Sequence, residues 1–163
     1  MGTIVSAGPN SYRINFVPPF PLGVIPSVFA AFSGIDSGDN WRGALEVVNA
    51  NFSHCDIQVS TWGSSNLYQT NVQWIACPRN LSGVEMGTFH GAGGHSGGIR
   101  LRNTFFTAPS LFLGIQRFDI GPGQNARLRL RATSTPTWVN WSIDTWSNSL
   151  VYNVIGVYFA ISS

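Results

Sequence analysis

The sequence contains no lysine, and all nine of its basic residues are arginine. This absence excludes a Schiff-base lysine and the lysine of a phosphate-binding P-loop. Charged residues make up only 10% of the chain, and the formal net charge is +2. So small a charge does not provide a surface that follows a nucleic-acid backbone. We therefore do not expect a nucleic acid among the partners of this protein.

Long apolar runs are absent as well. No stretch of the sequence approaches the roughly 20 apolar residues of a membrane-spanning helix, so we expect no membrane insertion. Residues Met1–Asn10 have neither the basic region nor the long apolar region of a signal peptide. These features together predict a cytoplasmic or non-classically secreted protein.

Residues that ligate metals or act as nucleophiles are few. Two cysteines, Cys55 and Cys77, do not make a disulfide framework, and we expect free thiols, with a single bridge between them as the alternative. None of the three histidines has the spacing of zinc ligands. The glycine-rich segment 91–98 lacks the lysine of a phosphate loop and leads into a strand-like run, so we interpret it as a connecting loop. We therefore predict no metal and no cofactor.

What the sequence does contain is an internal repeat with an offset near 84 residues. The repeat pairs Met1-Gly-Thr3 with Met86-Gly-Thr88, Gly34-Ile-Asp36 with Arg117-Phe-Asp119, Asn40-Trp-Arg42 with Asn125-Ala-Arg127, Ser60-Thr-Trp62 with Asp144-Thr-Trp146, Tyr68 with Tyr152, and Val72-Gln-Trp-Ile-Ala76 with Gly156-Val-Tyr-Phe-Ala160. Ordered matches at one offset indicate a tandem duplication. We place the two domains at residues 1–80 and 86–163, separated by a short polar segment.

Both halves have the pattern of β-strands separated by turns. Hydrophobic residues make up 44% of the chain, glycine and proline are plentiful, and no stretch keeps a helical period. Strand-like runs lie at 12–17, 27–33, 43–48, 56–61 and 71–76, and again at 98–102, 110–116, 126–132, 139–145 and 154–161. Turn signals such as Gly34 separate them. We therefore predict an all-β chain of two tandem antiparallel β-sandwich domains, each with about six strands.

Each half carries an arginine, a Thr-Trp pair and a tyrosine at nearly the same spacing. The two sets are Arg42, Trp62 and Tyr68 in the first half, and Arg127, Trp146 and Tyr152 in the second. The face of a tryptophan covers the apolar C–H side of a pyranose, arginine donates to hydroxyl groups, and tyrosine adds an amphipathic wall. The sets indicate sites for a neutral sugar. In the alternative interpretation, the tryptophans cap the core and the arginines pair with carboxylates.

The seven carboxylates do not indicate a glycosidase. A glycosidase needs two carboxyl groups on either side of one bond. Asp36 and Asp119 occupy equivalent turns in separate halves, and we do not expect them to face one another. The nucleophile motif Gly-x-Ser-x-Gly does not occur. We therefore expect no enzyme activity.

The ordered motifs resemble the H-type lectin domain, the family of the snail agglutinins and of the C-terminal domain of the discoidins. The resemblance rests on Phe16–Phe20, Pro26-Ser-Val-Phe29, Ser33-Gly-Ile-Asp36, Asn40-Trp-Arg42, Ser60-Thr-Trp62, Tyr68 and Val72-Gln-Trp-Ile-Ala76, and it recurs in the second half. The second copy departs further from the family pattern, with Tyr158 in place of Trp74. The family implies a six-stranded sandwich, trimers around a three-fold axis, and clefts between neighbouring domains that bind galactose or N-acetylgalactosamine.

The resemblance implies which residues of this sequence would contact a sugar. They are the arginine, the tryptophan, the residue after it and the tyrosine of each half: Arg42, Trp62, Gly63, Tyr68, Arg127, Trp146, Ser147 and Tyr152. The family also draws an acidic residue from the N-terminal segment of an adjacent chain. Here no acidic residue precedes Asp36, and Asn10 and His95 stand near the corresponding places. With Asp36 and Asp119, these two complete the candidates.

The sequence thus predicts a non-catalytic, carbohydrate-binding lectin. We expect a homotrimer with six domains that binds glycans on glycoproteins or glycolipids through avidity. Because the N-terminal segment and the residue after each tryptophan differ between the halves, we expect two sites unequal in sugar preference or strength. The alternative hypothesis is an oligomerisation or adhesion module in which one or both sugar sites are lost.

Overall fold

The computed structural model describes residues 1–6, 8–38, 40–122 and 125–162, which contain strands and no helix. The strands of the first half are β1 (Gly2–Ser6), β2 (Asn10–Asn15), β3 (Pro26–Gly38), β4 (Trp41–Val48), β5 (His54–Ser60) and β6 (Asn66–Pro78). Those of the second half are β7 (Val84–Gly91), β8 (Ser96–Arg100), β9 (Ser110–Ile120), β10 (Arg129–Ser134), β11 (Trp138–Asp144) and β12 (Val151–Ile161). The predicted all-β, duplicated architecture is confirmed.

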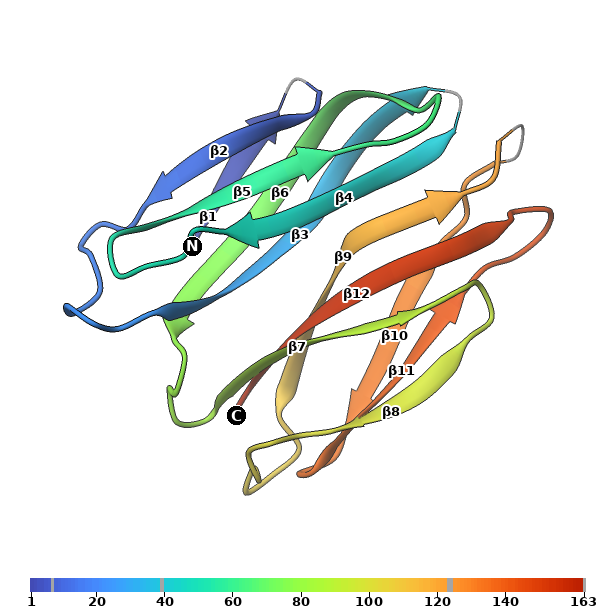
Figure 1. Ribbon diagram of the computed structural model, residues 1–163. Helices are drawn as coiled ribbons and strands as arrows, with labels where there is room; N and C mark the ends of the chain where they lie inside the picture. Colours follow the sequence, from blue (N-terminus) through green and yellow to red (C-terminus); the bar gives the residue numbers. More distant parts are fainter. Residues whose placement is uncertain (7, 39, 123–124, 163) are drawn as a thin grey trace.

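Each half is a sandwich of two antiparallel layers (Figure 1). In the first half, β1, β6 and β3 form one layer, and β2, β5 and β4 form the other. In the second half, β7, β12 and β9 form one layer, and β8, β11 and β10 form the other. The two strand orders correspond one to one, as a duplication requires.

The duplication extends to the irregularities of the ladders. The β3–β6 ladder shifts register after Phe32 and again after Asp36. The β9–β12 ladder shifts at the two corresponding places. Gly34, which the sequence predicted as a turn, lies at the first shift inside β3, so that prediction was wrong. A glycine within a strand commonly marks a β-bulge, because a bulge bends the strand and needs an adaptable backbone.

The remaining corrections concern strand ends. The predicted runs found most strands to within a few residues, but they missed β1 and β7. Both are edge strands, held by pairing with β6 and β12 and not by a strong pattern of their own. The segment 91–98 was predicted as a loop, but only residues 92–95 form a connection, since β7 ends at Gly91 and β8 begins at Ser96.

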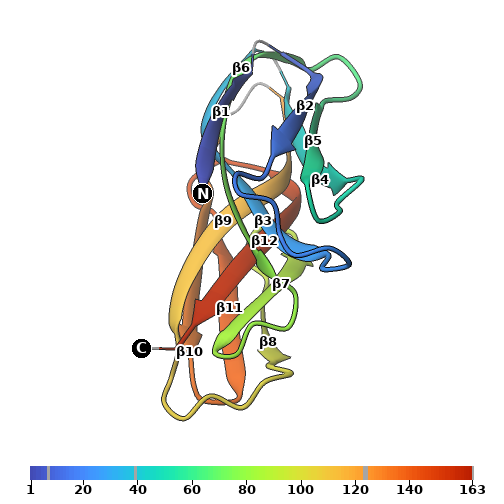
Figure 2. The same ribbon diagram turned by 90° about the vertical axis from the view of Figure 1, so that its left-hand side faces the viewer.

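The two halves are joined by a backbone ladder as well as by the linker. β4 of the first half pairs with β9 of the second over Trp41–Ala44. Phe32 of β3 also pairs with Ile115 of β9. Figure 2 shows β9 and β12 reaching from the second half towards the first. Both layers of the first half and one layer of the second half, formed by β7, β12 and β9, thus belong to one nine-stranded sheet.

Each half has its own hydrophobic core, centred on Ile57 in the first and Ile143 in the second, and both side chains are 0% exposed. Full burial of one such side chain stabilises the fold by about 2–3 kcal/mol. A third cluster, which includes Phe29 and Phe159, packs the halves against each other. The interface is therefore apolar in its centre as well as hydrogen-bonded at its edge.

The cysteines are both free, as predicted, which excludes the alternative of a bridge. Cys55 is buried in the first core and Cys77 is half-buried. Burial and the neighbouring charge of Asp56 raise the pKa of the Cys55 thiol to about 11. A thiol with so high a pKa stays protonated and chemically inert near neutral pH.

Candidate functional site

The two Thr-Trp segments form the same turn. The backbone N–H of Ser65 points to the carbonyl oxygen of Trp62 at 3.4 Å, and that of Ser149 to Trp146 at 3.5 Å. The residue after each tryptophan has a left-handed backbone, with φ of 64° at Gly63 and 58° at Ser147. The repeat therefore preserves the turn even though the side chain after the tryptophan differs.

Arg42 lies beside this turn in the first half. Its Nη1 atom is 2.7 Å from the place that a Cβ atom on Gly63 would take. Thr61 donates a hydrogen bond of 2.7 Å to the carbonyl oxygen of Arg42 and so ties the turn to β4. The structure thus brings Arg42 to the turn that carries Trp62.

The second half contributes two side chains to the same place. Arg42 Nε donates to Asp119 Oδ1 at 3.0 Å, and both side chains are less than a quarter exposed. Arg117, two residues earlier on β9, holds its guanidinium carbon 4.5 Å from the centre of the Trp62 ring. The face of Trp62 is therefore covered by a cation, and the arginine is engaged with a carboxylate.

The second site is open by comparison. Trp146 is 48% exposed and Tyr152 55% exposed. Arg127 Nη1 donates to the neutral Asn148 Oδ1 at 3.0 Å. Its backbone N–H donates to Ser149 Oγ at 2.9 Å, which holds the arginine against the turn. An exposed aromatic ring thus stands next to an arginine that no carboxylate of the described residues engages.

A further arginine, Arg129, stands over Trp146. Arg129 places its guanidinium carbon 5.6 Å from the centre of the Trp146 ring. Arg129 and Arg131 both pair with Asp144, at 3.2 and 2.7 Å. Partial burial raises the pKa of the Asp144 carboxyl, but a hydrogen bond from Ser142 and these arginines outweigh it and lower that pKa overall. Asp144 therefore stays charged, binds both arginines and fixes Arg129 beside the ring.

The tyrosines follow the turns on β6 and β12. Tyr68 is 58% exposed and lies against Gly38, where its hydroxyl is 2.8 Å from the place of a Cβ atom. Tyr152 lies in the same way against Gly121. Both are accessible to a ligand.

The remaining candidates fall in different places. The side chain of Asn10 accepts from the backbone of Ser11, and that of His95 accepts from Ala92 within its own turn. Neither is bonded to an arginine of the sites in the described part of the chain. Asp119 enters the first site, but from the other half of the molecule. Asp36 forms no ion pair with any described residue.

Sequence reasoning missed Arg117, Arg129 and Asn148. The sequence did contain an indication of Arg129, because Arg127, Arg129 and Arg131 occupy every second position and would lie on the same face of a strand. No sequence pattern indicated Arg117, because its position near Trp62 depends on the pairing of β9 with β4.

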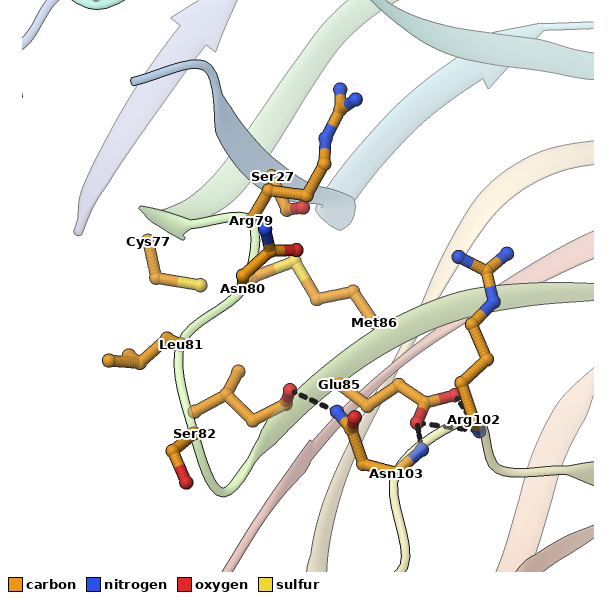
Figure 3. A pocket seen from close by; sticks show the side chains of 11 residues that line it. Ser27, Cys77, Arg79, Asn80, Leu81, Ser82, Glu85, Met86, Arg102 and Asn103 are labelled. Atoms are coloured by element: carbon orange, nitrogen blue, oxygen red, sulfur yellow. Dashed lines mark hydrogen bonds between the residues drawn. The ribbon is translucent and has the colours of Figure 1, made fainter. Parts of the chain in front are cut away.

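A separate hollow of about 540 Å³ lies beside the linker between β6 and β7 (Figure 3). Glu85 accepts there from the backbone N–H groups of Arg102 and Asn103, at 2.9 Å each. Burial and the charge of Glu85 raise the pKa of the adjoining Tyr158 to about 12. These bonds brace the linker. No predicted sugar-contacting residue lines this hollow.

Other kinds of site are not evident in the described residues. No group of three or more His, Cys, Asp and Glu side chains there could hold a metal ion. None of the described segments is a helix long and apolar enough to cross a membrane. What the geometry offers is an exposed ring, hydrogen-bond donors and a tyrosine on a rigid turn, which is a binding arrangement on a duplicated β-sandwich.

The comparison with family models agrees with this class of protein. The model of the H-type lectin domain matches residues 11–77 and 99–161, which together make up most of the chain. The chain therefore belongs to the H-type lectin domain family, with two copies of the domain. The comparisons with curated proteins and with solved structures gave no match.

Proposed function

We propose that this protein is a non-catalytic, multivalent lectin for glycans that contain galactose or N-acetylgalactosamine. Membership of the H-type lectin family supports carbohydrate binding in general. The observation that supports the finer proposal is the turn at Trp146, where the exposed ring and Arg127 meet and from which β12 leads to the exposed Tyr152.

Recognition would divide between these groups according to their chemistry. The Trp146 ring covers the apolar face of a pyranose, which galactose presents on one side. Arg127 donates to ring hydroxyls with a planar guanidinium, and that group also offers donors to an acetamido carbonyl. Such shallow sites bind weakly one at a time. A homotrimer with six domains would therefore gain its useful affinity on surfaces that display many glycans.

For the first half we propose a second function, that of an assembly module. Arg117 stands 4.5 Å from the centre of the Trp62 ring, closer than Arg129 stands to Trp146 at 5.6 Å, and it covers a face on which a sugar would stack. Asp119 engages Arg42, which would otherwise donate to the sugar. We therefore expect one sugar bound per chain, at the second half.

Calorimetry with N-acetylgalactosamine and glycan-array binding test the proposal. We expect a stoichiometry of one sugar per chain, array binding competed by free galactose, loss of binding in Trp146→Ala and no loss in Trp62→Ala. Trp138→Ala is the matched control, since Trp138 is also an exposed tryptophan, at 43%, but lies outside both sites. A folded protein that binds no glycan would refute the lectin proposal. Two sugars per chain would refute the silent first half.

A further inference from the structure

Equivalent strand edges of the two halves are used differently. β4 begins at Trp41, and its first residues pair with β9. In the second half the corresponding strand, β10, begins only at Arg129. Ser60 and Asp144 are equivalent residues of the repeat. Because Ala44 pairs with Ser60 and Arg129 pairs with Asp144, Ala44 and Arg129 are equivalent as well. Residues 126–128 are thus the counterpart of a paired strand, but they have no ladder partner among the described residues.

The complementary edge is also unpaired. In the second half, residues 117–120 of β9 receive β4. Their counterpart in the first half is residues 34–37 of β3, which pair with β6 on one side only. A hollow of about 210 Å³ lies over the adjoining β3–β6 ladder, lined by Gly34, Ile35 and Asp36 of β3 and by Gln69 and Asn71 of β6. The side-chain oxygen of Asn71 is buried there without a hydrogen-bond partner among the described residues.

The charged residues on these edges also differ between the two halves in their pairing. Between the halves, Arg42 of β4 pairs with Asp119 of β9 and stands opposite it in the ladder. The counterparts are Arg127 and Asp36. Arg127 bonds to a neutral amide, and Asp36 has no ion-pair partner among the described residues. A cation and an anion that match one another therefore stand on two unpaired edges of one chain.

We propose that these edges bind each other between two copies of the chain. Residues 126–129 of one copy add as a strand to residues 34–37 of β3 in a second copy, and Arg127 pairs with Asp36 of that second copy. The contact repeats between copies what β4 and β9 do within one. An exposed strand edge is a ready template for such pairing. Because different surfaces meet, the association runs head to tail.

The second copy would complete the open sugar site without covering it. In the first site, Arg117 stands over Trp62. The counterpart of Arg117 is Gly34, which has no side chain, so the second copy would add no further arginine over Trp146 beside Arg129 of the same chain. Asp36 would stand beside Arg127 as an acceptor for sugar hydroxyls. This last step rests on the proposed function, whereas the contact between copies does not.

Sedimentation of the sugar-free protein over a range of concentrations tests the contact. Asp36→Arg and Arg127→Asp each place like charges opposite one another, and we expect self-association of each variant to weaken by about a hundredfold. An equimolar mixture of the two restores opposite charges at every contact between unlike copies, so we expect association to return. Glu46→Arg, the same charge change at an exposed position of β4 outside both edges, should associate like the wild type.

A cysteine pair gives a second measurement that does not depend on charge. Ser37 and Ala126 are the counterparts of Ile120 and Trp41, which stand opposite each other in the ladder. Oxidation of a mixture of Ser37→Cys and Ala126→Cys should yield a disulfide-linked dimer of the two variants. Neither variant alone, nor the wild type with its native cysteines, should yield it.

Several results would overturn the inference. They are a monomeric wild type at every concentration, charge variants that associate like the wild type, a mixture that stays dissociated, or the absence of the mixed disulfide. Association that follows the charges, in a protein that binds no sugar, would leave the contact standing and refute only the proposed function.

Discussion

Arg42 and Asp119 lie 77 residues apart in the chain, yet they form an ion pair with 3.0 Å between Nε and Oδ1. They stand opposite each other where β4 of the first half pairs with β9 of the second. The arginine that the repeat marks as a sugar ligand is therefore also a link between the halves. In the first half, the proposed sugar contact and the packing of the two halves would depend on the same side chain.

Removal of this link should lower stability. We expect Asp119→Ala to reduce the free energy of unfolding by about 1–2 kcal/mol, because a half-buried arginine loses a charged hydrogen bond. For a chain of this length, the melting temperature should fall by about 2–4 °C for each kcal/mol. Thermal melting monitored by circular dichroism measures the change.

A double-mutant cycle of Asp119→Ala and Arg42→Ala isolates the pair itself, and we expect a coupling energy of about 1 kcal/mol. A parallel cycle on Arg13 and Asp56 controls for an ion pair within one half, 2.9 Å long. Additive losses at Arg42 and Asp119 would contradict the role assigned to their contact.

A second prediction concerns the stability of variants in the turn after each tryptophan. Gly63 has a left-handed backbone and faces Arg42 Nη1. Gly63→Ala should therefore destabilise the fold by about 1 kcal/mol, since a side chain is strained at positive φ. Ser147 already tolerates the same conformation, so Ser147→Gly should change stability by less than about 0.5 kcal/mol. Urea midpoints compare the two variants, and equal effects would show that the two turns are not alike.

Protonation of Asp56 at acid pH should lower the stability of the first half. Hydrogen bonds from Arg13 and Asn49 lower the pKa of this carboxyl to about 2 in the folded state, against about 3.9 in an unfolded chain. Because the folded pKa is the lower one, the contribution is complete above about pH 4 and is lost as the pH falls through 2. Asp56→Asn should flatten the fall in melting temperature across that window. Arg131→Ala, at the other carboxylate with a lowered pKa, should leave the contribution of Asp56 unchanged.

The thiols give a test of burial. Burial raises the pKa of Cys77 as well as that of Cys55, which reaches about 11. At pH 8 the native chain should therefore react slowly with a disulfide reagent, and Cys55, in the first core, should react only when that half unfolds. Titration of Cys77→Ser with and without denaturant measures Cys55 alone. Rapid reaction of Cys55 in the folded chain would contradict its position in the core.

Much of the architecture could be predicted from sequence because the duplication supplies each pattern twice. Apolar alternation located ten of the strands, and the repeated Arg, Thr-Trp and Tyr marked both turns. β1 and β7 were missed, since edge strands owe their conformation to the neighbour with which they pair. Gly34 was mistaken for a turn, because a glycine at a bulge and a glycine at a turn look the same in sequence.

The sequence by itself determined the class of fold, the copy number of the domain and the residues of each candidate site. These follow from local periodicity and from motifs that recur at one offset. The sequence also predicted that the two sites are unequal, but only the tertiary structure decided which side chains surround each of them. Arg117 reaches Trp62, and Asp119 reaches Arg42, because a backbone ladder joins two strands that are distant in the chain. No local pattern encodes such a pairing, since it depends on how two complete sandwiches pack.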